Sequence, residues 1–229
     1  MVDALAKIMI VDDEDDILEF LSYNLRNEQY DVKTVRDGKN AVKVAKNFEP
    51  DLILLDIMMP ELDGVEVCRM LREEKQFDST IIAFLTARNE DFTLIAALDA
   101  GGDDFITKPV KTRVLISRIR ALLRRPGRVP KEEQNSVLEF GDLIIDPEKF
   151  IIQLQGKNIN LARKEFELLF LLVSKPGKVF SRDEIFRRVW GTDVIVGNRT
   201  IDVHIRKLRE KMGDKFIKTV KGIGYKFEF

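Results

Sequence analysis

The chain has 229 residues, of which 45% are hydrophobic and 34% are charged, as in an ordinary soluble globular protein of one or two domains. No apolar run reaches the ~18 residues that a membrane helix needs, and no basic segment precedes an apolar one at the N-terminus, so we expect neither membrane insertion nor a signal peptide. One cysteine, Cys68, and one histidine, His204, exclude a disulfide framework and most His-dependent catalysis and favour a cytoplasmic location.

The net charge of −1 divides unevenly along the chain. Residues 1–125 carry 24 acidic and 18 basic side chains, a net charge of −6, whereas residues 126–229 carry 15 and 20, a net charge of +5. Chance scatter could produce this difference. Two halves of opposite sign nevertheless favour two domains with different partners, and the basic half indicates a nucleic acid as one of them.

The first half alternates short apolar runs with amphipathic stretches. Leu52–Leu55 is an unbroken apolar run, which is typical of a strand buried on both faces. Five successive strand–helix units predict an α/β fold, a doubly wound five-stranded parallel sheet with helices on both faces. The predicted strands are Lys7–Val11, Asp31–Val35, Leu52–Leu55, Ile81–Leu85 and Asp104–Ile106, and the predicted helices are 15–27, 38–47, 64–74, 90–100 and 112–124.

Polar side chains follow four of these strands. Asp12 and Asp13 follow the first strand, Asp56 the third, Thr86 the fourth and Lys108 the fifth. The carboxyl ends of parallel strands meet at one edge of a sheet, so we expect these groups to lie close together. Strand-end Asp residues that only cap the following helices are the alternative, but five such groups are hard to assign to capping.

Three carboxylates held close together repel one another unless a cation lies among them. Mg²⁺ prefers oxygen ligands and sites that also offer phosphate oxygens. Because neither His nor Cys is available, a carboxylate is the natural covalent acceptor of a phosphoryl group. We therefore interpret Asp56 as the nucleophile, with Lys108 and Thr86 in contact with the transferred group.

The segments IVDDE, LLDIMMPELDG, FLTAR and DDFITKP together resemble the receiver domain of two-component response regulators, over the first 125 residues. In that family a sensor histidine kinase supplies the phosphoryl group. The resemblance implies Asp56 as the phosphoacceptor. It implies that Asp13 and the backbone carbonyl of Met58 join Asp56 on Mg²⁺, with Asp12 acting through water.

The same resemblance implies two residues that respond to the phosphoryl group, Thr86 and Lys108. It places Phe105 where the family has an aromatic switch residue, usually Tyr. A phenylalanine keeps the ring and loses the hydroxyl. A core aromatic is the alternative interpretation of this residue.

The second half follows a predicted linker, residues 126–136, which contain two prolines, a glycine and no apolar period. Short strand patterns predict a small antiparallel sheet, and three helices and a C-terminal hairpin follow. The predicted strands are Leu138–Phe140, Leu143–Asp146, Phe150–Leu154 and Asn158–Leu161, the helices are 162–174, 182–190 and 199–212, and the hairpin joins Phe216–Val220 to Tyr225–Phe229.

Helix 199–212 has two different faces. Ile201, Ile205, Leu208 and Met212 form an apolar stripe that we expect to face the core. At ~100° per residue the opposite face carries basic and small side chains, which fits a DNA major groove. A solvated charged helix is the alternative. The side chains expected on the outer face and its flanks are Arg199, Thr200, Val203, Arg206 and Lys207.

The segments RKEFELL, PGKVFSRDEIFRRVWG, RTIDVHIRKLREKM and TVKGIGYKF resemble the winged-helix effector domain of the OmpR/PhoB subfamily, over residues 137–229. The resemblance implies an α+β winged helix-turn-helix whose third helix enters the major groove and whose hairpin enters the minor groove. Residues 192–198 match a loop that meets RNA polymerase. For His204 a packing role is the alternative. The DNA-contact residues so implied are Arg199, Thr200, Val203, His204, Arg206, Lys207, Arg209, Thr219, Lys221, Gly222 and Tyr225.

Phosphorylated receivers of this subfamily usually dimerise through their fourth helix, fifth strand and fifth helix, using charge pairs. Leu94 and Val114 occupy the positions of one such pair. The dimer would then use an apolar contact in place of this ion pair, or be weaker, or form without phosphate. An exposed ion pair contributes only ~0–1 kcal/mol, so its loss need not abolish dimers. The residues left for the other pairs are Asp99, Asp104, Arg118 and Arg120.

One further departure from the subfamily concerns a helix start. Ala162 stands where the family has a capping Thr, three residues before Glu165. Losing such a cap costs ~1 kcal/mol unless Asn160 replaces it.

These features together predict a transcription regulator that is switched by phosphorylation of Asp56 and that binds double-stranded DNA as a homodimer. One alternative is a phosphatase-like aspartyl phosphotransferase, but such enzymes need a second acid where this chain has Met58. Another is a regulator that binds DNA without phosphate.

Overall fold

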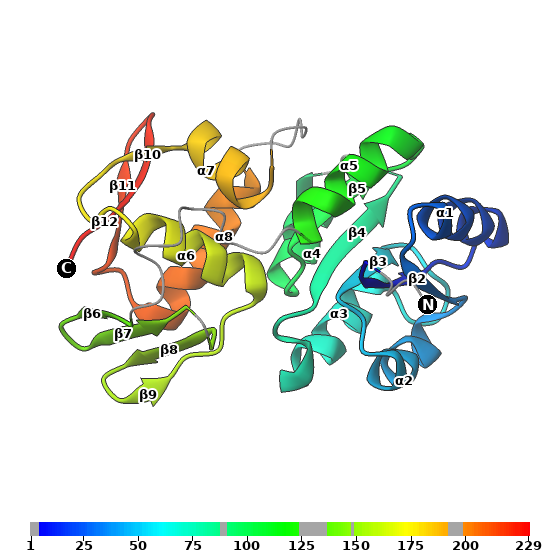
Figure 1. Ribbon diagram of the computed structural model, residues 1–229, viewed down its shortest axis with the longest axis horizontal. Helices are drawn as coiled ribbons and strands as arrows, with labels where there is room; N and C mark the ends of the chain where they lie inside the picture. Colours follow the sequence, from blue (N-terminus) through cyan, green and yellow to red (C-terminus); the bar gives the residue numbers. More distant parts are fainter. Residues whose placement is uncertain (1–4, 88–90, 124–136, 148, 192–198) are drawn as a thin grey trace. The chain divides into compact units, whose positions relative to one another are not determined.

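The computed structural model describes residues 5–87, 91–123, 137–147, 149–191 and 199–229. The chain divides into two compact units, 1–123 and 124–229 (Figure 1). The predicted linker, 126–136, and the loop 192–198 lie outside the described residues. Among the described helices, none combines the length and apolarity needed to cross a bilayer.

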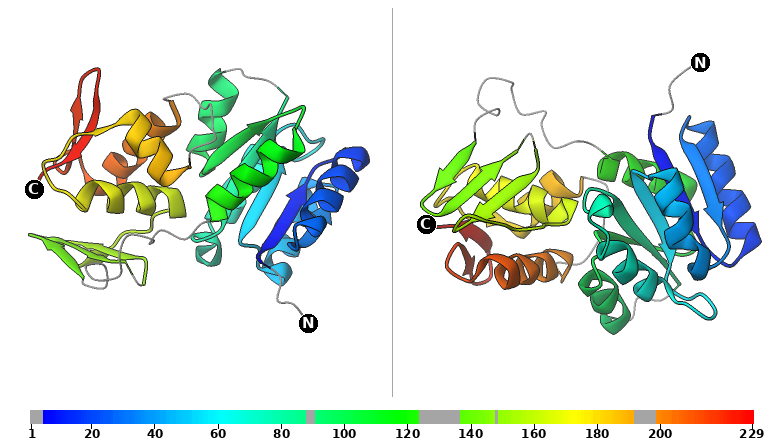
Figure 2. Two further views of the ribbon diagram at one scale, coloured as in Figure 1. Left: turned by 45° about the horizontal axis from the view of Figure 1, so that its top comes forward. Right: turned by 90° about the horizontal axis from the view of Figure 1, so that it is seen from below.

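The first unit is built on a five-stranded parallel sheet with the order β2-β1-β3-β4-β5. Every residue of β3 and β4 is buried, as the apolar run of β3 predicted. Helices cover both faces, α1 and α5 on one and α2, α3 and α4 on the other (Figures 1 and 2). The predicted doubly wound fold is confirmed. The elements are β1 Lys7–Val11, α1 Asp15–Asn27, β2 Asp31–Val35, α2 Gly38–Phe48, β3 Leu52–Asp56, α3 Gly64–Arg72, a 3-10 turn Lys75–Phe77, β4 Ile81–Thr86, α4 Asp91–Asp99, β5 Asp104–Thr107 and α5 Thr112–Leu123.

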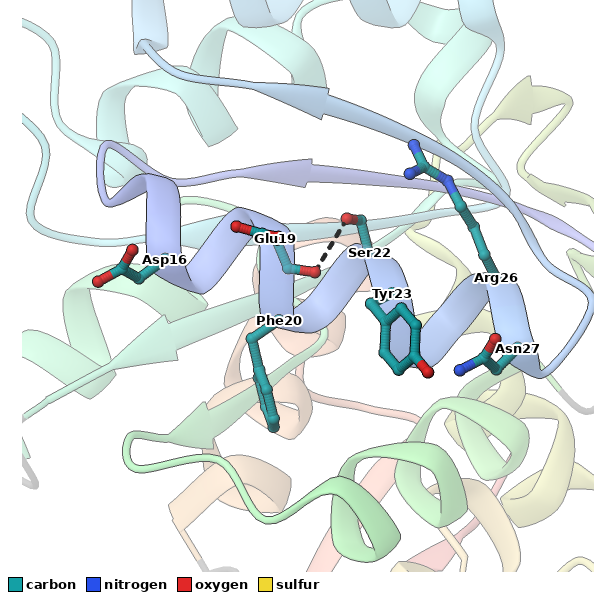
Figure 3. A pocket seen from close by; sticks show the side chains of 7 residues that line it. All are labelled: Asp16, Glu19, Phe20, Ser22, Tyr23, Arg26 and Asn27. Carbon is teal, nitrogen blue, oxygen red and sulfur yellow. Dashed lines mark hydrogen bonds between the residues drawn. The ribbon is translucent and has the colours of Figure 1, made fainter.

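Helix α1 covers the sheet with a leucine face and leaves aromatic rings exposed. Phe20 is 42% exposed and Tyr23 is 66% exposed. Figure 3 shows both rings on the same side of the helix, with Asp16 toward its start and Asn27 toward its end. The helix is therefore amphipathic, but its outer face is not uniformly polar.

The described part of the second unit contains two antiparallel sheets and the helices α6, α7 and α8 (Figure 1). One sheet has the order β6-β7-β8-β9 and the other β10-β12-β11. The predicted α+β fold and C-terminal hairpin are confirmed. The elements are β6 Leu138–Phe140, β7 Leu143–Asp146, β8 Ile151–Leu154, β9 Lys157–Asn158, α6 Arg163–Val173, β10 Phe180–Ser181, α7 Arg182–Val189, α8 Arg199–Met212, β11 Ile217–Val220 and β12 Gly224–Phe227.

Two details of these sheets differ from the sequence prediction. Strand β9 pairs earlier than predicted, because Gln155 and Gly156 adopt positive φ and close a tight turn that sets Leu154 opposite Lys157. Strand β10 was not predicted, since two residues carry no periodic signal. It pairs with β12, where a Cβ on Gly224 would lie 2.0 Å from the Phe180 carbonyl oxygen.

Helix α6 begins with only half of a capping box. The backbone N–H of Ala162 donates to Glu165 Oε2 at 2.9 Å, but the Ala162 side chain has no oxygen to accept in return. Glu165 also accepts from Lys211 Nζ at 2.6 Å, so its carboxylate ties the start of α6 to α8. The missing half is the bond that a Thr would make.

We expect Ala162→Thr to raise the free energy of unfolding of the second unit by ~1 kcal/mol, because the hydroxyl would accept from the N–H of Glu165. Urea unfolding followed through the fluorescence of Trp190, the only tryptophan, measures this unit. Ala162→Val is the matched control, since it has the same shape without the oxygen. Equal midpoints for the Thr and Val variants would contradict the prediction.

Candidate functional site

Three carboxylates meet at the carboxyl edge of the parallel sheet. One oxygen each from Asp12, Asp13 and Asp56 lie within 4.8 Å of one another. Asp12 is fully buried, and Asp56, at the end of β3, is 5% exposed. The proximity predicted from the strand ends is therefore present, and it brings like charges together in a poorly solvated place.

Lys108 lies among these carboxylates. Its Nζ is 2.8 Å from Asp12 Oδ2 and 3.1 Å from Asp56 Oδ1. It is also 3.2 Å from Glu14 Oε1, a contact that the sequence analysis missed although Glu14 continues the acidic run after β1. The backbone N–H of Lys108 donates to the Thr86 carbonyl at 2.7 Å, which fixes the lysine beside the end of β4.

The two charges at the centre of the site have shifted pKa values. Burial raises the pKa of Asp56 to about 6, and the Asp12 and Asp13 charges add to this effect while Lys108 opposes it. Burial alone would lower the pKa of Lys108, but hydrogen bonds and charge from Asp12 and Asp56 outweigh it and raise that pKa. The lysine therefore stays cationic and compensates the carboxylates.

The remaining predicted site residues surround this cluster. Thr86 is buried at the end of β4 and lies in register with Thr107 on the neighbouring strand β5. Phe105 on β5 is half-buried, and its ring centre lies 5.9 Å from the Arg118 guanidinium. Met58, two residues after Asp56, is 68% exposed.

Gly64 holds the loop after Asp56 in place, and the sequence analysis did not identify it. A Cβ on Gly64 would lie 2.0 Å from the carbonyl oxygen of Asp56, so no larger residue fits. The Gly64 N–H donates to the Ile57 carbonyl at 3.0 Å. The start of α3 therefore lies directly against the backbone of Asp56. The LDG motif that ends at Gly64 is the sequence signal that could have indicated this contact.

The side chains expected to form charge pairs with a second copy are paired within the chain. Arg118 makes two hydrogen bonds to the Asp104 carboxylate, of 2.7 and 2.6 Å, and both side chains are buried. Arg120 contacts Glu28. Asp99 is exposed. Asp104, Arg118 and Arg120 thus have counter-ions on the same unit, and their use in a dimer stays a prediction.

The apolar positions of that face remain accessible. Val114 on α5 is 48% exposed, and Leu94 on α4 is half-buried.

Helix α8 is buried over a wider arc than its apolar stripe predicted. Thr200, Val203, His204 and Lys207 are all 9% exposed or less. The His204 ring lies 5.1 Å from the Trp190 ring, and its Nδ1 is 2.8 Å from the Thr200 carbonyl oxygen. The expected placement of Thr200, Val203 and Lys207 on the outer side of the helix was therefore wrong, because α8 also packs against α6 and α7. The contacts of His204 fit its interpretation as a packing residue.

The exposed side of α8 faces the C-terminal hairpin. Arg206 is exposed, and Arg209 donates to Thr219 Oγ1 at 2.8 Å. At the hairpin tip Lys221 and Gly222 are exposed, with Gly222 at φ 75°. Tyr225 is 4% exposed. Of Arg199 only the helical backbone is described.

Comparisons with known proteins match both units. Residues 8–120 match the family described as "Response regulator receiver domain", and residues 156–227 match "Transcriptional regulatory protein, C terminal". The "Alkaline phosphatase synthesis transcriptional regulatory protein PhoP" of Bacillus subtilis (strain 168) is 40% identical, over 97% of this chain and 96% of that protein. The chain belongs to the OmpR/PhoB family of two-component response regulators.

Solved structures agree with this assignment. "Response Regulator DrrB, a Thermotoga maritima OmpR/PhoB Homolog" is 33% identical, with a TM-score of 0.51 over 98% of this chain and 99% of that chain. A mutant of the protein named RitR is 28% identical, with a TM-score of 0.77 over 97% of this chain and 98% of that chain. The resemblance seen in the motifs is confirmed, and the two units are a receiver and a winged-helix effector.

The raised pKa of Asp56 has a consequence for the stability of this regulator. Because the folded receiver holds the Asp56 proton more tightly than the unfolded chain, its free energy of unfolding should fall as pH rises from about 4 through about 6. The loss amounts to about 2–3 kcal/mol in buffer without divalent metal. Asp56→Asn should lack this part of the pH dependence.

Urea unfolding of both proteins at pH 4 and pH 7, followed by circular dichroism, measures the effect. The stability of Asp56→Asn relative to the unmodified chain should increase between these pH values. Parallel pH profiles would show that Asp56 is not destabilised by its surroundings.

Proposed function

We propose that this response regulator accepts a phosphoryl group on Asp56 from a sensor histidine kinase and, in response, dimerises and binds DNA to regulate transcription. The observation that carries the proposal is the Lys108 ammonium held between the carboxylates of Asp12 and Asp56. Lys108 would bind phosphate oxygens directly beside Asp56, the nucleophile. The kinase is the partner that a response regulator of this family implies.

The donor set fits Mg²⁺, since it consists of three carboxylate oxygens within 4.8 Å of one another. We propose that Asp13, Asp56 and the backbone carbonyl of Met58 hold the ion, with Asp12 acting through water. When bound, Mg²⁺ would offset carboxylate charge and bind phosphoryl oxygens.

The reaction itself belongs to the chain's own residues. A carboxylate oxygen of Asp56 attacks the phosphorus while the bond to the donor's leaving group breaks, and the acyl phosphate forms. The Lys108 ammonium and the Thr86 hydroxyl contact the phosphoryl oxygens as negative charge develops on them. The protein acts here as a phosphoryl acceptor and not as a turnover enzyme.

The acyl phosphate would then place ~1.5–2 negative charges at the sheet edge, where the Asp56 carboxylate carried one. Lys108, now shared among Asp12, Asp56 and Glu14, would turn toward the phosphoryl oxygens. Thr86 and Phe105 would follow and reshape the face made by α4, β5 and α5. A change from mostly off to mostly on requires about 5.5 kcal/mol of bias, which phosphoryl contacts and dimer formation would supply together.

The dimer face of this chain would use apolar contact in place of one ion pair. Val114 is exposed, and Leu94 lies half-buried on α4, at the other position of that pair. Asp104 and Arg118 are already paired within the chain, so a dimer would have to share or exchange that pair.

The effector is the DNA-binding part of the proposal. Its net charge of +5 suits a polyanion. We propose that α8 enters the major groove, that the hairpin tip with Lys221 enters the minor groove, and that two effectors occupy half-sites about one helical turn apart. RNA polymerase would contact residues 192–198.

Incubation with Mg²⁺ and acetyl phosphate should add one phosphoryl group per chain, and Asp56→Asn should abolish the addition because it removes the nucleophile. Intact-mass spectrometry measures this directly. Asp63→Asn is the matched control, since Asp63 lies on the same loop and its oxygen only caps α3 at Glu66 N–H, which Asn can also do. An adduct on Asp56→Asn, or none on the unmodified chain with either acetyl phosphate or phosphoramidate, would count against the proposal.

Lys221→Ala should weaken binding to a DNA duplex several-fold and reduce the slope of log affinity against log salt by about one, because one phosphate contact is lost. Fluorescence anisotropy at several salt concentrations measures both quantities. Lys157→Ala, on β9 of the other sheet, is the control and should leave the slope unchanged. An equal slope for Lys221→Ala and the unmodified chain would remove the hairpin tip from the interface.

A further inference from the structure

A compact polar cluster joins three elements of the effector. Asp202 lies on α8, Arg182 is the first residue of α7, and Tyr225 lies on β12. The Tyr225 hydroxyl donates to Asp202 Oδ1 at 2.5 Å. Arg182 donates from Nε to the same oxygen at 3.2 Å and from Nη2 to the Tyr225 hydroxyl at 3.1 Å. One carboxylate oxygen therefore holds two donors from two different elements.

Packing makes this cluster rigid. Tyr225 is 4% exposed, and the Arg182 guanidinium lies 5.0 Å from its ring centre. Burial and the hydrogen bond to Asp202 raise the pKa of Tyr225 to about 12, so the phenol keeps its proton and remains a donor. Arg182 uses Nε and Nη2 in the cluster, which leaves the two N–H groups of Nη1, as far as the described residues show, for another acceptor.

The cluster lies on the exposed side of the helix proposed to enter DNA. Asp202 and Tyr225 line a groove with Arg206 and Arg209. Arg182 begins α7, where its own N–H donates to the Ile223 carbonyl and the Glu184 N–H donates to Ser181 Oγ. Asp183 and Glu184 occupy the first turn, so the guanidinium of Arg182, and not the helix start, is the group that would meet an anion here.

Three carboxylates, those of Asp202, Glu210 and Asp214, line this groove and oppose the binding of a polyanion if their charge is considered alone. The Asp202 side chain is 47% exposed and would repel phosphate. Its contacts have the opposite effect, because Asp202 holds Arg182 and Tyr225 in place before DNA binds. Less conformational entropy is then lost on binding.

We propose that Asp202 is a positioning residue for DNA binding, which holds Arg182 so that its Nη1 group meets a backbone phosphate beside the start of α7. This inference rests on the proposed DNA-binding function. It makes Arg182 a phosphate contact, although the sequence motifs had not selected it. Asp202 itself would not touch DNA.

The test compares two variants that each remove one negative charge from the same helix, Asp202→Asn and Glu210→Gln. Glu210 is exposed and pairs with Arg206 at 2.7 Å, outside the Tyr225 cluster. The probe is a 30-base-pair duplex of random sequence, titrated with the full chain over a range of salt concentrations. Charge alone predicts that both variants bind more tightly.

Under the proposal Asp202→Asn binds about five-fold more weakly and its salt slope falls by about one, because Arg182 no longer makes its phosphate contact. Glu210→Gln binds equally well or more tightly. Tighter binding by Asp202→Asn, with an unchanged slope, would overturn the inference. If the unmodified chain bound no duplex even at low salt, the DNA-binding function itself would fail.

A double variant separates positioning from a general loss of structure. Arg182→Gln alone should show the same weakening as Asp202→Asn, and Arg182→Gln/Asp202→Asn should show no further loss. The unfolding midpoint from Trp190 fluorescence identifies variants that fail to fold. For a folded double variant, a second full loss of affinity would show that Asp202 acts independently of Arg182 and would overturn the inference.

Discussion

The receiver brings oxygens of three carboxylates within 4.8 Å of one another, and the Lys108 ammonium offsets the repulsion among them. Burial makes the charged form of Asp56 costly, which is why its pKa is raised to about 6 even with Lys108 beside it. A site of this kind favours a cation for the same reason that it costs stability, because a positive charge offsets the repulsion among the carboxylates. Each new charge partner relieves a strain that folding alone leaves in place.

The backbone explains why the repulsion cannot relax. Strand β3 is buried along its whole length, so the Asp56 carboxylate leaves the sheet at a fixed point. Gly64 then brings the start of α3 to the Asp56 carbonyl at a distance that excludes any side chain. With the Lys108 N–H bonded to the Thr86 carbonyl, the neighbouring strand ends are fixed as well. The same few peptide units therefore hold the carboxylates close together and prevent them from moving apart.

The sequence predicted the features of the fold and site that depend on hydrophobic periodicity and on the order of the strands. The buried run of β3, the parallel order of the receiver and the convergence of Asp12, Asp13, Asp56 and Lys108 follow from alternation and from the rule for strand ends.

What the sequence could not show depends on which elements pack together. Helix α8 contacts α6 and α7 as well as the sheet, so a single apolar stripe underestimated its buried arc. Asp104 and Arg118 pair within the chain because β5 and α5 lie side by side, a distance that no spacing in the sequence encodes. The role of Gly64 likewise appears only when α3 and β3 are placed together.

Both proposed functional surfaces contain a residue whose charge is opposite to that of its immediate partners. Lys108 stands among acids on the receiver, and Asp202 stands beside arginines on the effector. On the effector, net charge favours the approach of DNA, whereas Asp202 fixes the geometry of a neighbouring arginine before DNA arrives. On the receiver, Lys108 both attracts the phosphoryl group and holds the carboxylates close together. A phosphoryl oxygen in one case and a DNA phosphate in the other would then meet side chains that are already ordered, and on the effector the residue that weakens the long-range attraction would make the short-range contact possible.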